Sequence, residues 1–224
     1  MILAGLCACQ ATPSETETPA DARLTVGFVL VDGVFNTELT APYDIFQHTV
    51  YHVDPGMRVF CVAPSLEPVR TFEGLRLLPD YSFDNAPAID VLVVPSAEHS
   101  MDSDLDNQEL IDFVRERALT ADYVMSLCDG AFVLARAGLL EGREATTFPS
   151  DRETLQAKFP NVRVHSDATL VSDGKFITSV GGAPSFEAAL YLTEVLYGAE
   201  KARGLAGGLV IDWDLAKIAY LEFN

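Results

Sequence analysis

Cys128 is the residue of this sequence best placed to do chemistry. It follows the apolar run 123–127 and precedes Asp129 and Gly130, after which a mostly apolar stretch begins. A residue between the C-terminal end of a strand and the start of a helix lies at the crevice where open α/β sheets bind ligands. The amides that open such a helix stabilise a thiolate and a developing oxyanion, which predicts a nucleophilic cysteine with a depressed pKa. A cysteine that only fills the core is the alternative interpretation.

The four histidines offer one candidate base. His48 and His52 lie along a predicted helix, and His165 lies in a strand-loop region, so these three are interpreted as structural or solvated. His99 follows a predicted strand whose end faces the same crevice as Cys128. His99 is therefore a candidate substitute base, and an exposed loop histidine is the alternative.

Short apolar runs alternate with amphipathic stretches from Leu24 onward, a pattern typical of βαβ units with a parallel sheet. The predicted strands are 24–31, 58–63, 75–78, 91–94, 123–127, 162–164, 169–171 and 176–178. The predicted helices are 40–53 with Pro42 in its first turn, 107–121, 131–140 and 185–197. Asp173-Gly174 predicts a hairpin turn, Ser185 an N-cap and Gly198 a helix stop. The sequence therefore predicts an α/β fold with a nucleophile elbow at Cys128.

Composition bounds the class of protein. The chain has 224 residues, of which 49% are hydrophobic and 21% charged, so residues 24–224 are expected to form one globular domain. The formal net charge of −18 repels phosphate backbones, so no nucleic-acid partner is expected. The four cysteines, at positions 7, 9, 61 and 128, show neither metal-ligand spacing nor the density of a disulfide framework. No metal site or other cofactor is predicted.

Residues 1–23 are interpreted as a lipoprotein signal remnant followed by a flexible tether. The apolar opening is too short to span a bilayer, and residues 10–23 are rich in Thr, Pro, Glu and Ala. Leu6-Cys7-Ala8-Cys9 resembles a bacterial lipobox, which predicts a lipid on Cys9 and a periplasmic or cell-surface location. Membrane contact would then run only through that lipid. A frayed tail on a cytoplasmic protein is the alternative.

The segment from Cys128 to Thr147 resembles the elbow region of the ThiJ/PfpI superfamily, the DJ-one relatives. Its most specific part is the string Ala-Gly-Leu-Leu-Glu-Gly-Arg-Glu-Ala-Thr-Thr, residues 137–147. The resemblance extends from Leu24 to about Leu205 and is greatest to the subgroup that contains isonitrile hydratases and domains fused to transcription regulators. It implies a class I glutamine-amidotransferase-like fold, a flavodoxin-like three-layer αβα sandwich that is usually a homodimer.

The resemblance also implies roles for individual residues. Glu38 matches the acidic side chain that approaches the nucleophile and tunes its ionisation. A first-turn glutamate favoured by the helix dipole is the alternative, and Glu98 is a weaker candidate carboxylate. The backbone amides of Ala97 and Asp129 match the oxyanion pocket.

Two departures from the family pattern bear on catalysis. Relatives commonly carry a histidine after the Thr-Thr pair, where this chain has Phe148, and paired glycines where it has Ser96 and Ala97. A phenyl ring cannot relay a proton. The leading hypothesis is a cysteine-dependent hydrolase or hydratase of a small molecule, similar to isonitrile hydratase, with Cys128 as nucleophile and Glu38 as its acid/base partner. The alternative is a non-catalytic small-molecule-binding or redox-sensing domain.

Overall fold

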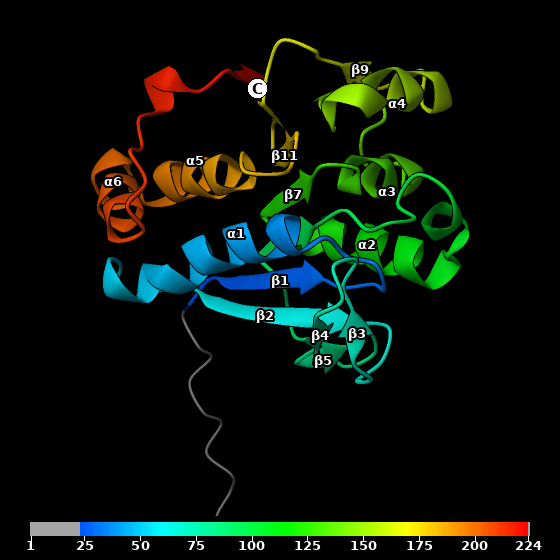
Figure 1. Cartoon of the computed structure of the whole chain (residues 1–224), viewed down its shortest axis with the longest axis horizontal. Coiled ribbons are helices and arrows are strands. Elements are labelled where there is room, and N and C mark those ends of the chain that lie inside the picture. The colour runs from blue at the N-terminus through cyan, green and yellow to red at the C-terminus, as the bar shows by residue number, and fades with distance from the viewer. Residues whose placement is uncertain (1–22, 224) are drawn as a thin grey trace, which may run out of the picture.

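Eight strands form the central sheet, in the order β12-β10-β11-β7-β6-β1-β2-β5 (Figure 1). The computed structural model of the protein describes residues 23–223. The strands are β1 Thr25–Val29, β2 Arg58–Ala63, β5 Tyr81–Ser82, β6 Val91–Val94, β7 Tyr123–Leu127, β10 Leu170–Asp173, β11 Phe176–Ser179 and β12 Tyr220–Phe223. Neighbouring strands are parallel except for β10 and β11, which form the predicted hairpin at Gly174. The prediction of a mostly parallel α/β sheet is confirmed.

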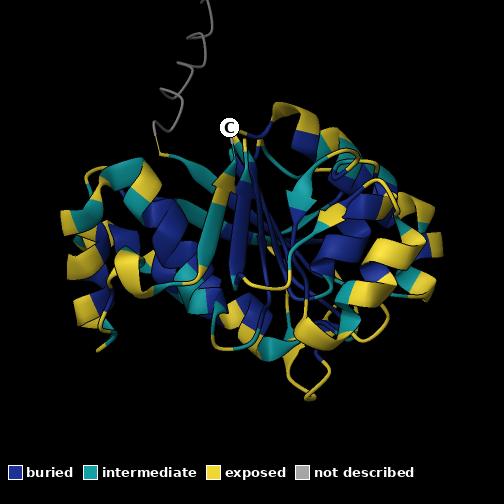
Figure 2. Cartoon of the chain, turned by 90° about the horizontal axis from the view of Figure 1, so that it is seen from above, coloured by how far each residue is buried: buried dark blue, intermediate teal, exposed yellow. Residues whose placement is uncertain are grey.

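Helices cover both faces of this sheet, so the fold has three layers (Figure 2). One layer holds α1 Asn36–His48, α5 Ser185–Tyr197 and α6 Ala199–Gly208, which contact one another. The other holds α2 Gln108–Thr120, α3 Gly130–Arg136 and α4 Arg152–Lys158. The remaining elements are short: β3 Val69–Arg70 with β4 Arg76–Leu77, β8 Glu144–Ala145 with β9 Arg163–Val164, and the 3-10 turns Thr49–Tyr51, Ser103–Asp106, Pro149–Asp151 and Leu215–Lys217.

The central strands are buried on both faces, as their continuous apolar runs predict. In β6, Leu92 and Val94 contribute to the core under α2 and α3, whereas Val91 and Val93 contribute to the core under α1 and α5. All four residues of this strand are buried. Successive side chains of a strand point to opposite faces of the sheet, which explains this alternation between the two cores. The same alternation determines which residues at the strand ends face the ligand crevice.

The first helix begins earlier than predicted. It starts at Asn36 instead of Thr40, and the amide of Leu39 already donates to the carbonyl of Phe35. Pro42 therefore lies inside the helix and not in its first turn. The prediction that Pro42 lies in the first turn was wrong. A proline inside a helix costs one backbone hydrogen bond, and burial of the side chain against the sheet offsets this cost. The earlier start places Glu38 in the first helical turn.

Other differences lie at element ends and in the C-terminal part. Helix α3 ends at Arg136, before the predicted Leu140. Ser185 is not an N-cap that accepts a backbone bond, because Pro184 occupies that position and the Ser185 hydroxyl is buried without a partner among the described residues. Gly198, with φ of 86°, ends α5 as predicted. The helices α4 and α6 and the strand β12 were not predicted.

The predicted lipid-bearing Cys9 and tether fall outside residues 23–223. Within that range no helix is both long and apolar enough to cross a bilayer.

Candidate functional site

Cys128 stands at a sharp turn between β7 and α3. Its φ is 53°, in the left-handed region that residues with a side chain rarely adopt, and its amide donates to the carbonyl of Ser179 at 2.9 Å. Backbone strain of this kind costs about 1–3 kcal/mol and is concentrated at functional sites. The predicted strand-turn-helix elbow is therefore present, and its geometry favours a functional cysteine over one that only fills the core.

Two glycines make this turn sterically feasible. A Cβ on Gly130 would lie 2.1 Å from the carbonyl oxygen of Val94, so only glycine lets α3 start this close to β6. A Cβ on Gly181, whose φ is 78°, would lie 2.3 Å from the Cβ of Cys128. The ends of β6, β7 and β11 can therefore meet at Cys128. Glycine occupies the two positions at which any side chain would clash.

Cys128 opens into a pocket of about 220 Å³ at the carboxyl ends of the strands. The lining residues come from three separate stretches of chain: Phe35, Glu38, Cys128, Asp129, Phe148 and Asp151. Phe148, one of these lining residues, is 41% exposed. A pocket of this size suits a small molecule with one polar reacting group and one apolar group. Among the described residues no group of three or more His, Cys, Asp and Glu side chains is arranged to hold a metal ion.

Glu38 is the carboxylate that the structure brings to this pocket, as predicted from the sequence. Its side chain is 8% exposed, and its Oε1 accepts a hydrogen bond from the amide of Gly182 at 2.9 Å. Gly182 lies 144 residues away in the chain and next to the glycine that contacts Cys128, so the bond fixes Glu38 relative to the elbow. Glu98 does not line this pocket; it lies beside Gly33 in a different one.

The prediction of a depressed pKa for Cys128 is wrong. Burial raises the pKa of the thiol to about 12, and the negative charges of Asp129 and Glu38 add to the rise. The Ser96 hydroxyl and the Asp129 amide act in the opposite direction and lower the pKa of the thiol. The helix that follows has only seven residues, so its dipole is weak against three unfavourable effects. A free thiolate is scarce at neutral pH, and the site therefore needs a group that takes the thiol proton.

Among the charged groups that raise the pKa of that thiol, Asp129 has the larger effect and Glu38 the smaller one. Burial raises the pKa of the Asp129 carboxyl to about 6, hydrogen bonds from Thr147 and Cys128 lower it, and the Asp151 carboxyl raises it. The thiol and Asp129 thus influence each other: the charge of the Asp129 carboxylate raises the pKa of the thiol, and the Asp129 amide lowers it. From the sequence Asp129 was assigned a backbone role only, and Asp151 was not singled out. No local pattern marks Asp151, because it reaches the pocket only through the turn that follows β8.

The predicted oxyanion amide of Ala97 is already engaged, since it donates to the Ser100 hydroxyl at 2.8 Å. Its role and that of the Asp129 amide stay predictions. The structure does not bring His99 to Cys128. Its imidazole lies 3.4 Å from Asp102 and lines another pocket, with Asp32 and Pro64. The hypothesis of His99 as substitute base is therefore wrong for this geometry, because the loop after β6 turns its side chain away from the elbow.

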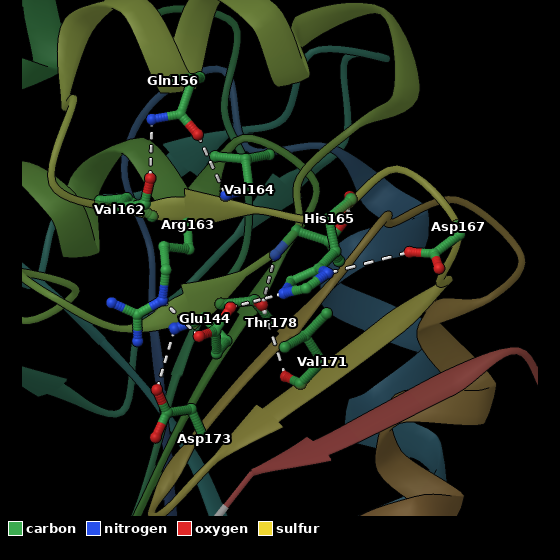
Figure 3. Close-up of polar contacts among 11 residues, drawn as sticks. Glu144, Gln156, Val162, Arg163, Val164, His165, Asp167, Val171, Asp173 and Thr178 are labelled. Atoms are coloured by element: carbon green, nitrogen blue, oxygen red, sulfur yellow. Dashed lines mark hydrogen bonds and ion pairs between the residues drawn. The ribbon is translucent and has the colours of Figure 1, made fainter.

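A polar network joins residues in and next to β8 and β9 to Asp173 and Thr178 of the central sheet (Figure 3). His165 Nε2 lies 2.6 Å from Glu144 Oε2, and the amide of Glu144 donates to Asp173 at 2.9 Å. The next residues continue inward: the Thr146 amide donates to Thr178, and the Thr147 hydroxyl donates to the carbonyl of Cys128 at 3.0 Å. His165 is structural, as predicted, and it supports the segment that contacts the nucleophile.

Comparison with known proteins agrees with this geometry. Residues 24–194 match the DJ-1/PfpI family. The chain is 33% identical over 181 residues to the isonitrile hydratase of Pseudomonas putida, which covers 80% of this chain and 75% of that protein. It is 29% identical over 150 residues to Protein dj-1beta of Drosophila melanogaster, covering 66% and 79%. A crystal structure of a ThiJ/PfpI family protein from Pseudomonas syringae superimposes with a TM-score of 0.76 at 25% identity, over 93% of this chain and 83% of that one. The resemblance noted from the elbow segment is confirmed, and this chain belongs to the DJ-1/PfpI family.

Proposed function

We propose that this protein is a cysteine-dependent hydratase that adds water to a small neutral molecule, an isonitrile in the first instance. One observation carries the proposal: a cysteine held at a φ of 53° opens into a small pocket between two carboxyl groups, Glu38 and Asp129. The similarity to the Pseudomonas putida isonitrile hydratase supports the choice of substrate class. The carboxyl groups that line this pocket also disfavour an anionic substrate, because a carboxylate would repel it.

The proposed reaction balances without a cofactor. The thiol of Cys128 adds across the terminal carbon of the isonitrile; the S–H bond breaks, an S–C bond forms, and the thiol proton ends on that same carbon to give a thioimidate. Water then adds to this carbon and one of its protons goes to nitrogen. The C–S bond breaks, the remaining hydroxyl becomes a carbonyl, and its proton returns to sulfur. The product is an N-substituted formamide, and Glu38 holds the water and accepts its proton in transit.

The test is direct. The protein of residues 23–224 is incubated with an alkyl isonitrile, and the N-formamide is followed by mass spectrometry. We expect turnover in the range of ordinary enzymes, on the order of 1–1000 per second or somewhat below it. Absence of formamide above the rate in buffer, with Cys128 intact and the chain folded, would contradict the proposal.

A second candidate function is a non-catalytic small-molecule-binding domain. Two observations favour it: burial raises the pKa of Cys128 to about 12, and Phe148 stands where relatives carry a histidine. Binding of an isonitrile, seen by calorimetry without any formamide, would favour this candidate.

Replacing Phe148 by histidine should raise turnover. The side chain lines the pocket of Cys128 and is 41% exposed, so an imidazole there reaches the reacting atoms at little cost in stability. General acid–base groups contribute about a hundredfold or more, and we expect a gain of up to that size in kcat/KM. Thermal unfolding of both proteins checks that the fold is unchanged. The conservative variant Phe148→Leu, which has no ring nitrogen, should show no gain.

Two further expectations stay predictions. We propose that Cys9 carries a lipid in a membrane-anchored form and that the folded domain is a homodimer. Detergent partitioning of the native protein tests the first, and sedimentation of the folded domain tests the second.

A further inference from the structure

We propose that Asp129, paired with Asp151, is the proton donor and acceptor that serves Cys128 in this chain. The hydration chemistry that it would serve rests on the function proposed above. Asp129 is not a packing residue. It follows the nucleophile directly in the chain and lines the same pocket, and its charge acts on the Cys128 thiol.

The contacts of Thr147 are compatible with both the acid and the base form of this carboxyl group. The Thr147 hydroxyl lies 3.0 Å from the carbonyl oxygen of Cys128 and 3.0 Å from Oδ1 of Asp129. A hydroxyl holds one proton, and a backbone carbonyl can only accept. When Thr147 donates to the carbonyl, its contact with Asp129 becomes a full hydrogen bond only if the carboxyl group carries a proton and donates it. The arrangement therefore suits a carboxyl group that alternates between its acid and its base form.

Asp151 makes both forms accessible near neutral pH. Its carboxyl group lines the same pocket as that of Asp129, and its negative charge raises the pKa of Asp129. The titratable groups that face Asp129 are Cys128 on the elbow, Asp151 on the turn after β8 and Glu38 across the pocket from α1. Burial and the nearby charge of Asp151 therefore keep Asp129 partly in its acid form at a pH where a solvent-exposed aspartate would have lost its proton.

A second, independent feature points to a reacting group at this position. The Ser96 hydroxyl is completely buried and has no hydrogen-bond partner among the described residues, yet it faces the sulfur of Cys128. A buried hydroxyl without a partner costs free energy of folding unless a charged group or a ligand forms a hydrogen bond with it. A thiolate, or an anion that develops on the bound substrate, is such a partner. The Asp129 carboxyl group and the Ser96 hydroxyl thus both act on the Cys128 thiol.

In the proposed hydration, Asp129 moves the protons that the thiol cannot move alone. The Asp129 carboxylate takes the proton from sulfur as the S–C bond forms. The resulting acid then delivers that proton to the former isonitrile carbon, so the carboxylate is restored and no charge is left over. The same group can return a proton to sulfur when the C–S bond breaks. This is the work that a histidine after the Thr-Thr pair would do, and Phe148 cannot do it.

The experiment measures the alkylation of Cys128 by iodoacetamide as a function of pH, in the protein and in Asp129→Asn. If Asp129 acts only as a negative charge, its loss lowers the thiol pKa and speeds alkylation at every pH. If Asp129 takes the thiol proton, the wild-type rate rises through an inflection near pH 6, where its carboxyl ionises. Asp129→Asn then loses this inflection and reacts about tenfold or more slowly at neutral pH. The two roles therefore give changes of opposite sign.

Two further variants complete the test. Asp151→Asn removes the repulsion, so the inflection should move to lower pH while remaining visible. Glu153→Gln removes the same charge from an exposed residue of α4 outside the pocket and should leave the profile unchanged. Faster alkylation of Asp129→Asn, or an unmoved inflection in Asp151→Asn, would overturn the proposal. Circular dichroism of each variant shows whether a slow reaction reflects an unfolded chain.

The failure of this proposal is distinguishable from failure of the proposed function. Alkylation needs no natural substrate, so it reports on Asp129 even if the protein makes no formamide. If formamide is formed, Asp129→Asn should lower kcat about a hundredfold, and Phe148→His should restore more activity to Asp129→Asn than it adds to the wild type. Formamide formation that is unaffected in Asp129→Asn would leave the hydratase proposal standing and would reject the role of Asp129.

Discussion

Cys128→Ser is expected to abolish the hydration of an isonitrile. The serine oxygen is a far weaker nucleophile at neutral pH, and the same burial that raises the thiol pKa to about 12 would disfavour an alkoxide still more strongly. Loss of a nucleophile lowers kcat on the order of 10⁴-fold or more in well-studied enzymes, and we expect a decrease of that order. Formamide production measured by mass spectrometry, at matched protein concentration, gives the result.

The chain offers a matched control. Cys61 is the other free cysteine among residues 23–223, and it lies on β2 beside Asp80, lining a pocket with Leu39 and Tyr43 instead of Cys128. Burial raises the pKa of its thiol to about 12 as well, so the two thiols differ in position more than in acidity. Cys61→Ser should keep full activity. Equal loss in both variants would mean that oxidation or misfolding, and not the elbow cysteine, controls turnover; full activity in Cys128→Ser would reject the nucleophile.

The sequence predicts those parts of the site that one stretch of chain encodes. Cys128, Asp129 and Gly130 are adjacent, and the change from a strand run to a helix run marks the turn. Glu38 was found through its resemblance to a family motif, and the structure brings it to Cys128 through the Gly182 amide. Two other features depend on how β6, β8 and the turn after β8 pack together. They are the position of Asp151 in the pocket and the hydrogen bond that the Ala97 amide already makes. Neither can be read from local pattern.

The error in the Cys128 pKa has a related cause. The sequence shows the helix that follows the cysteine, which favours a thiolate, but it does not show the depth of burial or the carboxyl groups that arrive from elsewhere. Those effects prevail once α1 is packed over the elbow and Glu38 points at the pocket. A local electrostatic argument was therefore applied to a site whose charge state depends on tertiary structure.

The unpredicted helix α6 shows the same limit in the fold. Ala199–Gly208 contains three glycines, which lower helix propensity by about 1 kcal/mol each. Its buried face of Ala202, Leu205 and Ala206 joins the core under α5, and this burial stabilises a helix that its composition disfavours. The apolar runs of β2, β6, β7 and β11 and the amphipathic pattern of α2 are plain in the sequence, and their bounds were predicted to within a residue.

Gly130→Ala is expected to be the most destabilising single-methyl change in the elbow. The added Cβ would lie 2.1 Å from the Val94 oxygen, 3.1 Å from the Val94 carbonyl carbon and 3.3 Å from that of Pro95, all backbone atoms that no rotamer change can move. Relief requires α3 to shift off β6, and α3 carries the fully buried Phe132 and Leu134. Overpacking costs about 1–3 kcal/mol and occasionally more. We expect about 3 kcal/mol, which lowers Tm by about 6–12 °C for a domain of this size.

Gly207→Ala provides the comparison that isolates this close approach. It adds the same methyl group to a helical glycine, but Gly207 is exposed on α6 and its Cβ would meet nothing within 4 Å. Alanine favours helix over glycine by up to about 1 kcal/mol, so this variant should unfold at the same temperature or slightly higher. Differential scanning calorimetry of the two variants separates a general effect of glycine substitution from the contact at the elbow. If Gly130→Ala melts with the wild type, then α3 does not rest on the Val94 carbonyl, and the strained position of Cys128 needs another support.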